Sequence, residues 1–221
     1  MIKAILFDFN GTMFFDSKKH HEAWSAFSMK YCGKPLTQQD MSMLHGKNNF
    51  KIIQTLRPDF EDEDYINELS KEKEAMYRQS CLDDPDFTKL ASGLEDFMQR
   101  CLDQGIKMTI CSASIYENIQ FFIEIFDLKR FFDCDKIIYD DGFHEDKVSM
   151  FLDGAKELNV DISECVVFED SFSGLRFAHE AGAGKIICIC EEDKKSEYND
   201  IPYIDDIIHT YENLSTDILQ K

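Results

Sequence analysis

Short apolar segments alternate with helical segments through the second half of the sequence. The apolar segments span residues 107–111, 136–139, 166–168 and 185–189, and apolar side chains recur at helical spacing between them. This alternation is typical of a parallel sheet that is wound on both faces by helices. The N-terminal run Ile2–Phe7 fits another strand of that sheet, because a strand covered on both faces is almost entirely apolar. We therefore predict the α/β class, with a doubly wound parallel sheet.

The segment between the first strand and this alternating region has a different pattern. Asp16 or Ser17 can cap a helix that Gly33 would end. Asn48 can cap a shorter helix, and residues 63–80 have the spacing of a longer amphipathic one. The predicted domains are a core of residues 1–16 and 85–221 and an inserted α-helical cap domain of residues 17–84. An insertion beside the carboxyl end of the first strand is placed to act as a lid over it.

The charge balance is strongly acidic. Lys and Arg together number 24 against 43 Asp and Glu, and the formal net charge is −19. Nucleic acids and anionic membranes bind clustered basic side chains, so we expect neither as a partner. A small anionic substrate is compatible with this charge, because a divalent cation with one or two lysines can reverse the local potential.

The pattern of apolar residues and cysteines bears on location. No uninterrupted apolar stretch reaches about 18 residues, and the N-terminus lacks the sections of a signal peptide. The eight cysteines include no CxxC pair, which favours reduced thiols over a disulfide framework or a zinc site. We expect a cytoplasmic protein.

Polar side chains follow three of the predicted strands. Asp8 and Asn10 come after the first strand, Ser112 after residues 107–111, and Glu169 with Asp170 after residues 166–168. The carboxyl ends of parallel strands lie at one edge of a sheet, where such folds bind ligands. Asp8 and Asn10 should share a face there, because alternate residues of an extended chain point the same way. With Lys147, the set supplies a nucleophilic carboxylate, a hydroxyl donor, an ammonium group and oxygen ligands for Mg²⁺, which together suit phosphoryl transfer to a carboxylate.

Four short motifs stand in order around the helical insertion. They are Asp-Phe-Asn-Gly-Thr at 8–12, Ser-Ala-Ser at 112–114, Glu-Asp-Ser-Phe-Ser-Gly at 169–174 and Ala-Gly-Ala at 181–183. Asp16 and Ser17, followed by His20, His21, Ala23 and Trp24, complete the pattern at the start of the insertion. The whole chain resembles the haloacid dehalogenase (HAD) superfamily, in its β-phosphoglucomutase-like branch with a helical cap. The resemblance implies a Rossmann-like core, Mg²⁺ as cofactor, a small phosphorylated metabolite as partner, and a monomer.

The resemblance also implies roles for individual residues. Asp8 would attack the substrate phosphorus and become an aspartyl phosphate. Mg²⁺ would lie between Asp8, the main-chain carbonyl of Asn10 and Asp170, with Glu169 binding it directly or through another group. The catalytic candidates are Asp8, Asn10, Ser112 and Lys147, the metal candidates are Asp8, Asn10, Glu169 and Asp170, and the substrate-binding candidates are Gly11, Thr12, Ala113, His20, His45 and Lys47.

Two parts of the family pattern are altered in this sequence. An ungapped alignment of the helix near residue 158 puts Glu145 where the family has its lysine, so Lys147 comes two residues late. Its long, flexible side chain could still bring an ammonium to a phosphate. In the cap loop, His45 and Lys47 flank Gly46, but no arginine follows to grip a second phosphate, which disfavours a sugar phosphomutase.

The largest departure is Asn10. The family's phosphatases have an acid at this position that protonates the leaving group and later deprotonates water, and an amide can do neither. General acid–base catalysis contributes roughly 10² to 10⁴ in rate, so we expect a slow enzyme unless the leaving group needs little protonation, as in an acyl phosphate. We predict a phosphatase. The alternatives are a sugar phosphomutase, a carbon–phosphorus hydrolase that uses a cap lysine, and a non-catalytic binder of a phosphorylated metabolite.

Overall fold

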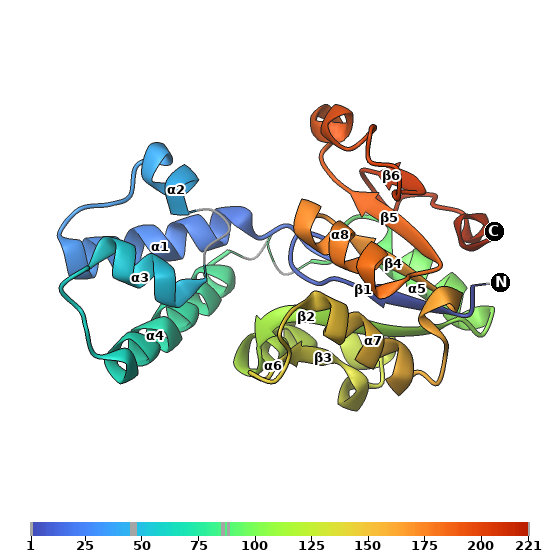
Figure 1. Ribbon diagram of the computed structural model, residues 1–221, viewed down its shortest axis with the longest axis horizontal. Coiled ribbons are helices and arrows are strands. Elements are labelled where there is room, and N and C mark those ends of the chain that lie inside the picture. Colours follow the sequence, from blue (N-terminus) through green and yellow to red (C-terminus); the bar gives the residue numbers. More distant parts are fainter. Residues whose placement is uncertain (1, 45–47, 85–86, 88, 221) are drawn as a thin grey trace. The chain divides into compact units, whose positions relative to one another are not determined.

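The computed structural model describes residues 2–44, 48–84, 87 and 89–220, except for the side chains of Gln38 and Ser42. The chain forms two compact units, one of residues 1–15 and 89–221 and the other of residues 16–88 (Figure 1). We call the first unit the core and the second the cap. In the described residues of the core a parallel sheet is present, whereas those of the cap contain only helices and turns.

The described part of the core contains a six-stranded parallel sheet with the strand order β3-β2-β1-β4-β5-β6. The strands are β1 (Ala4–Phe7), β2 (Lys107–Ile115), β3 (Ile138–Asp140), β4 (Cys165–Glu169), β5 (Lys185–Ile189) and β6 (Asp206–Ile208). From β1 the chain builds outward through β2 and β3, then returns to the other side of β1 with β4. The strand order therefore reverses between β1 and β4, and a crevice for a ligand is expected at the carboxyl ends of these two strands.

Helices cover both faces of this sheet (Figure 1). On one face lie α5 (Leu94–Asp103) and α6 (Tyr116–Ile125), and on the other lie α7 (Lys147–Glu157) and α8 (Phe172–Ala181). Alternate residues of β1 serve the two faces, as strand geometry requires. Leu6 belongs to an apolar cluster with Phe151 of α7, whereas the ring of Phe7 stacks on Phe168 at 5.2 Å. The doubly wound α/β fold predicted from the sequence is confirmed.

The described part of the cap consists of helices packed around an apolar cluster. The helices are α1 (Ser17–Cys32), α2 (Gln38–Leu44), α3 (Asn49–Leu56) and α4 (Glu63–Leu82). Gly33 has a left-handed backbone with φ 74° at the end of α1, and the Asn48 side chain accepts a hydrogen bond from the N–H of Lys51 at the start of α3. Both predicted helix boundaries are confirmed. No helix among the described residues is both long enough and apolar enough to cross a membrane.

Several strand boundaries differ from the prediction. β2 continues through Ser112 and Ser114, and β4 includes Glu169, so these polar residues lie at the ends of strands rather than after them. Pairing with a neighbouring strand carries the backbone past the apolar run, as the contact between Ile115 and Asp140 shows for β2. The sequence did not indicate β6, because this edge strand is short and none of its residues is fully buried.

Candidate active site

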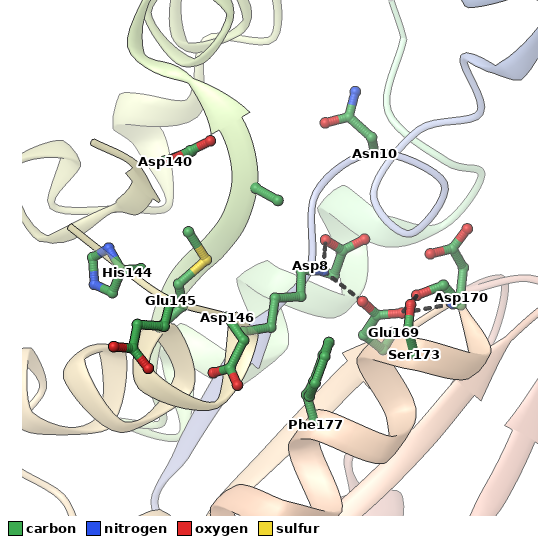
Figure 2. A pocket seen from close by; sticks show the side chains of 14 residues that line it. Asp8, Asn10, Asp140, His144, Glu145, Asp146, Glu169, Asp170, Ser173 and Phe177 are labelled. Carbon is green, nitrogen blue, oxygen red and sulfur yellow. Dashed lines mark hydrogen bonds and ion pairs between the residues drawn. The ribbon is translucent and has the colours of Figure 1, made fainter. Parts of the chain in front are cut away.

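A cavity of about 520 Å³ lies at the carboxyl ends of β1 and β4 in the core (Figure 2). It is lined by Asp8, Asn10, Ala113, Asp140, His144, Glu145, Asp146, Lys147, Met150, Glu169, Asp170, Ser171, Ser173 and Phe177. Six of these residues were candidates from the sequence: Asp8, Asn10, Ala113, Lys147, Glu169 and Asp170. The cavity is at the reversal of strand order, where an α/β sheet of this kind binds its ligands.

Asp8 follows β1 directly and is held from two sides. Its backbone N–H donates to the carbonyl of Phe168 on β4 at 2.9 Å. The ammonium of Lys147 donates to Oδ1 at 2.5 Å, and the hydroxyl of Thr12 donates to Oδ2 at 3.0 Å. Burial raises the pKa of Asp8 to about 6, with Lys147 acting to lower it and Glu169 acting to raise it. Near neutral pH the carboxylate is therefore mostly ionised, as a nucleophile must be.

Lys147 is the first residue of α7 and joins two carboxylates. Asp146 caps this helix, accepting hydrogen bonds from the N–H groups of Val148 and Ser149. The Lys147 ammonium also lies 2.5 Å from Oε1 of Glu169. Burial by itself lowers the pKa of Lys147, but the charges of Asp8 and Glu169 raise it above its usual value. Lys147 is thus a fixed positive charge at the cavity, and its contact with a phosphate stays a prediction.

Glu169 is fully buried and its second oxygen is also occupied. The backbone N–H of Ser171 donates to Oε2 at 2.6 Å, and the hydroxyl of the same serine donates to it at 3.0 Å. Gly174 leaves the room that this arrangement needs, because a Cβ there would lie 1.7 Å from Oε1 of Glu169. The glycine that ends the third sequence motif therefore has a packing role against the glutamate that begins it.

Asp170 completes a cluster of carboxylates. Asp8, Glu169 and Asp170 each place a carboxylate oxygen within 4.8 Å of the others. Asp170 lies against Gly11, which has φ 82° and where a Cβ would be 2.1 Å from Oδ2. Burial, with repulsion from Asp8 and Glu169, raises the pKa of Asp170 to about 9. A nearby cation would favour the ionised form of Asp170 that these neighbours oppose, so the three oxygen donors fit a hard divalent cation.

Asn10 lines the same cavity, but its side chain does not share a direction with Asp8. The amide of Asn10 points away from the three carboxylates (Figure 2). Its Oδ1 accepts a hydrogen bond from the hydroxyl of Ser114 at 2.7 Å. The carboxylate and the amide line one cavity, as predicted from the sequence, although β1 itself ends at Phe7 and the two side chains have different directions. Ser114 was not a candidate, although it belongs to the second sequence motif.

Thr12 and Ser112 are buried and are not among the residues that line the cavity. Thr12 has no exposed surface, and its hydroxyl is directed to Asp8. Ser112 is 1% exposed, and its Oγ accepts a hydrogen bond from the backbone N–H of Ser114 at 3.1 Å. Contacts of Gly11, Thr12 and Ser112 with a substrate stay predictions.

The candidate His20 lies in the cap, within a cluster that the sequence did not reveal. Its Nδ1 is 2.9 Å from the ammonium of Lys73, and its Nε2 is 3.2 Å from Oδ2 of Asp16. The His20 ring stacks on Tyr77 with 4.0 Å between the ring centroids. Burial lowers the pKa of Lys73, which also contacts Glu74 at 2.8 Å. No local signal distinguishes Lys73 within a helix rich in charges. The other cap candidates, His45 and Lys47, lie outside the described residues.

Comparisons with known proteins agree with this geometry. A family model described as "haloacid dehalogenase-like hydrolase" matches residues 2–182. The chain is similar to a crystallised HAD hydrolase of family IA, variant 3, from Entamoeba histolytica, with 33% identity and a TM-score of 0.91 over 99% of this chain and 97% of that one. It is 25% identical over 199 residues to glycerol-1-phosphate phosphohydrolase 1 of Saccharomyces cerevisiae, covering 85% of this chain and 74% of that protein.

A further relative matches over a shorter range. A haloacid dehalogenase-like hydrolase domain-containing protein of Arabidopsis thaliana is 29% identical over 111 residues, which span 49% of this chain and 35% of that protein. The family model itself extends from β1 to the end of α8, and it includes all the carboxylates of the cavity. By its sequence, its sheet and its cavity, the chain belongs to the haloacid dehalogenase-like hydrolases.

Proposed function

We propose that the chain is a Mg²⁺-dependent phosphatase that hydrolyses a small phosphorylated metabolite through an aspartyl phosphate on Asp8. The observation that carries this proposal is the environment of Asp8, a buried carboxylate held between Lys147 at 2.5 Å and Thr12 at 3.0 Å in a cavity. The similarity to a glycerol-1-phosphate phosphohydrolase supports the same chemistry.

The first step is attack by Asp8 on the substrate phosphorus. Each carboxylate oxygen has more than one lone pair, so an oxygen that accepts one hydrogen bond can still form the new O–P bond. As this bond forms, the bond from phosphorus to the leaving group breaks, and the leaving group takes the electron pair. In the second step water attacks the phosphorus of the aspartyl phosphate, which releases inorganic phosphate and restores the Asp8 carboxylate.

Lys147 and the carboxylates balance charge during these steps. An ammonium has three N–H donors, and Lys147 uses two of them on Asp8 and Glu169. We assign the third to an oxygen of the transferring phosphoryl group. Asp8, Asp170 and the main-chain carbonyl of Asn10 would hold Mg²⁺, while Glu169 orients Lys147 and the Ser171 loop. The ion would supply positive charge to the phosphoryl oxygens.

Asn10 restricts the leaving group. An alkoxide needs a proton as it departs, and the amide of Asn10 has no acidic proton to give. A carboxylate leaving group has a pKa of about 4 and departs as an anion at neutral pH, so an acyl phosphate needs no acid at this position. We therefore place acyl phosphates and other phosphates with acidic leaving groups among the best substrates.

The position of the Asn10 amide also favours a second candidate, a non-catalytic binder of a phosphorylated metabolite. Ser114 holds the Asn10 side chain away from Asp8, so neither step receives acid–base help from it. A binder would keep Asp8, Lys147 and the metal while turning over nothing.

A phosphate-release assay tests the proposal. The natural protein, Asp8→Ala and Asn10→Asp would be compared with Mg²⁺ on acetyl phosphate, p-nitrophenyl phosphate and a panel of alkyl phosphates. We expect release from acetyl phosphate by the natural protein, none by Asp8→Ala, and a gain on alkyl phosphates for Asn10→Asp. Tight binding of a phosphorylated ligand with no release from any substrate, acetyl phosphate included, would favour the binder.

A further inference from the structure

Two tyrosines from the segment after β5 donate hydrogen bonds to the loops of the active site. The hydroxyl of Tyr198 donates to the main-chain carbonyl of Asp170 at 3.0 Å. The hydroxyl of Tyr211 donates to the main-chain carbonyl of Thr12 at 3.2 Å. Both tyrosines lie beyond residue 182, where the match of the family model ends.

Tyr211 is fixed deep in the core. It is fully buried, and its ring lies 6.0 Å from that of Phe97 and 5.8 Å from that of Phe168 between centroids. Its backbone N–H donates to the carbonyl of Ser92 at 3.2 Å. The main-chain carbonyl of Thr12 accepts the hydrogen bond from the Tyr211 hydroxyl, and the side-chain hydroxyl of Thr12 donates a hydrogen bond to Asp8. Thr12 therefore links Tyr211 to Asp8 through two hydrogen bonds.

Tyr198 is fixed in a similar way beside the loop that contains Asp170. It is 7% exposed, and its ring stacks on Phe172, the first residue of α8, with 4.3 Å between centroids. Its hydroxyl donates to the main-chain carbonyl of Asp170, so the position of the ring fixes the place of this hydrogen bond. Asp170, which receives this hydrogen bond, follows Glu169 directly.

The two loops meet where the tyrosines hold them. Asp170 lies so close to Gly11 that a Cβ on that glycine would be 2.1 Å from Oδ2. Asp8, Glu169 and Asp170 place carboxylate oxygens within 4.8 Å of one another across this contact, so the spacing of the two loops sets the distances between these oxygens. A hydrogen bond to each loop backbone from a rigid, buried ring restricts the movement of that loop.

From these contacts we propose that Tyr198 and Tyr211 are positioning residues, which hold the Asp170 loop and the Asp8 loop at the spacing that Mg²⁺ requires. The inference rests on the metal site of the proposed function, but neither tyrosine touches the reacting atoms. Outer hydrogen bonds of this kind typically change metal affinity or activity by about 10- to 100-fold when they are removed.

The test compares Tyr198→Phe and Tyr211→Phe with the natural protein, each change removing only one hydroxyl. The control is Tyr203→Phe, because Tyr203 belongs to the same segment, stacks on His179 at 4.6 Å and donates to neither loop among the described residues. Mg²⁺ affinity would be measured by titration calorimetry, turnover on acetyl phosphate by phosphate release, and folding by thermal denaturation. We expect Mg²⁺ to bind about 10-fold more weakly to each of the first two variants, with Tyr203→Phe unchanged.

The outcomes separate this inference from the proposed function. Weaker Mg²⁺ binding in the two variants supports the inference even where the natural protein releases no phosphate, in which case only the phosphatase proposal fails. Unchanged Mg²⁺ affinity and turnover, with a lower melting temperature alone, would show that the tyrosines are merely structural and would overturn the inference while the phosphatase stands. A natural protein that binds no Mg²⁺ would overturn the inference too.

Discussion

Replacing Asn10 by aspartate tests the account of the missing acid most directly. Asparagine and aspartate have nearly the same shape, so the substitution adds a titratable group with little change in packing. The carboxylate would line the cavity at the position of the present amide (Figure 2). A general acid contributes roughly 10² to 10⁴ in rate, which corresponds to about 3 to 5 kcal/mol of activation free energy.

The contact with Ser114 determines how much of this gain is realised. The hydroxyl of Ser114 donates to Oδ1 of Asn10 at 2.7 Å, and it would donate in the same way to the introduced carboxylate. A hydrogen bond to a charged group is worth about 1.5 to 3 kcal/mol, so this donor should hold the pKa of the introduced carboxylate low. The acid would then be mostly ionised at neutral pH. We expect Asn10→Asp alone to gain near the lower limit, roughly 10²-fold on alkyl phosphates.

The double variant Asn10→Asp/Ser114→Ala separates the two effects. Without the serine donor the pKa of the introduced carboxylate rises, so the rate that depends on the protonated acid should persist to higher pH. The assay is kcat/KM against pH on an alkyl phosphate and on acetyl phosphate, with Ser114→Ala in the natural background as the control. Acetyl phosphate should show little change in any variant, because its leaving group needs no proton. An equal gain on both substrates, or no gain on the alkyl phosphate, would refute the reasoning.

Three other substitutions have definite outcomes. Lys147→Met leaves Asp8 and Glu169 buried without their cation, so it should abolish turnover and lower the free energy of unfolding by roughly 3 kcal/mol. Mg²⁺ should restore part of this loss of stability. Thermal denaturation with and without Mg²⁺ measures the effect, and Lys156→Met on the exposed side of the same helix is the control. Gly174→Ala puts a Cβ 1.7 Å from Oε1 of Glu169, so it should weaken Mg²⁺ binding in calorimetry about 10-fold or more, whereas Glu180→Ala at the exposed end of the helix should not. Burial lowers the pKa of Lys73, so the folded state binds fewer protons at this residue than the unfolded state does. The natural protein should therefore gain stability relative to Lys73→Met as the pH rises toward 10, which urea denaturation measures. An equal difference in stability at all pH values would contradict this.

The fold was predictable because its signals are local. An apolar run such as Ile5 to Phe7 reports a buried strand, and Gly33 or Asn48 reports a helix end, since each depends on the conformation of a few neighbouring residues. The ends of β2 and β4 were not predictable to the residue. Polar side chains continue there in extended backbone because the neighbouring strands supply the hydrogen bonds, and no local pattern records the pairing.

Part of the candidate active site was predictable for the same reason, and part was not. The positions of Asp8, Glu169 and Asp170 near strand ends of a parallel sheet predict that these residues lie close together. In the structure each places a carboxylate oxygen within 4.8 Å of the others. The direction of Asn10 depends on a hydroxyl from another strand, and Tyr211 reaches Thr12 across 199 positions of sequence. A tyrosine in an irregular segment gives no sign of the backbone carbonyl that it will meet.

The position of Lys147 shows why counting residues along a helix can mislead. Aligned from the end of α7, the lysine stands two residues late, and Glu145 takes its place. The start of the helix is fixed by other forces, because the Asp146 side chain accepts hydrogen bonds from Val148 at 2.9 Å and Ser149 at 3.3 Å. This cap makes Lys147 the first helical residue, directed at Asp8 and Glu169 at 2.5 Å, and leaves Glu145 in the preceding loop at the cavity wall. The ammonium lies beside two carboxylates because this cap begins the helix at a lysine. For the same electrostatic reason we expect the loss of Lys147 to cost more stability than the amide of Asn10 does. An amide in place of an acid withholds a proton, whereas a missing ammonium would leave buried negative charges without compensation.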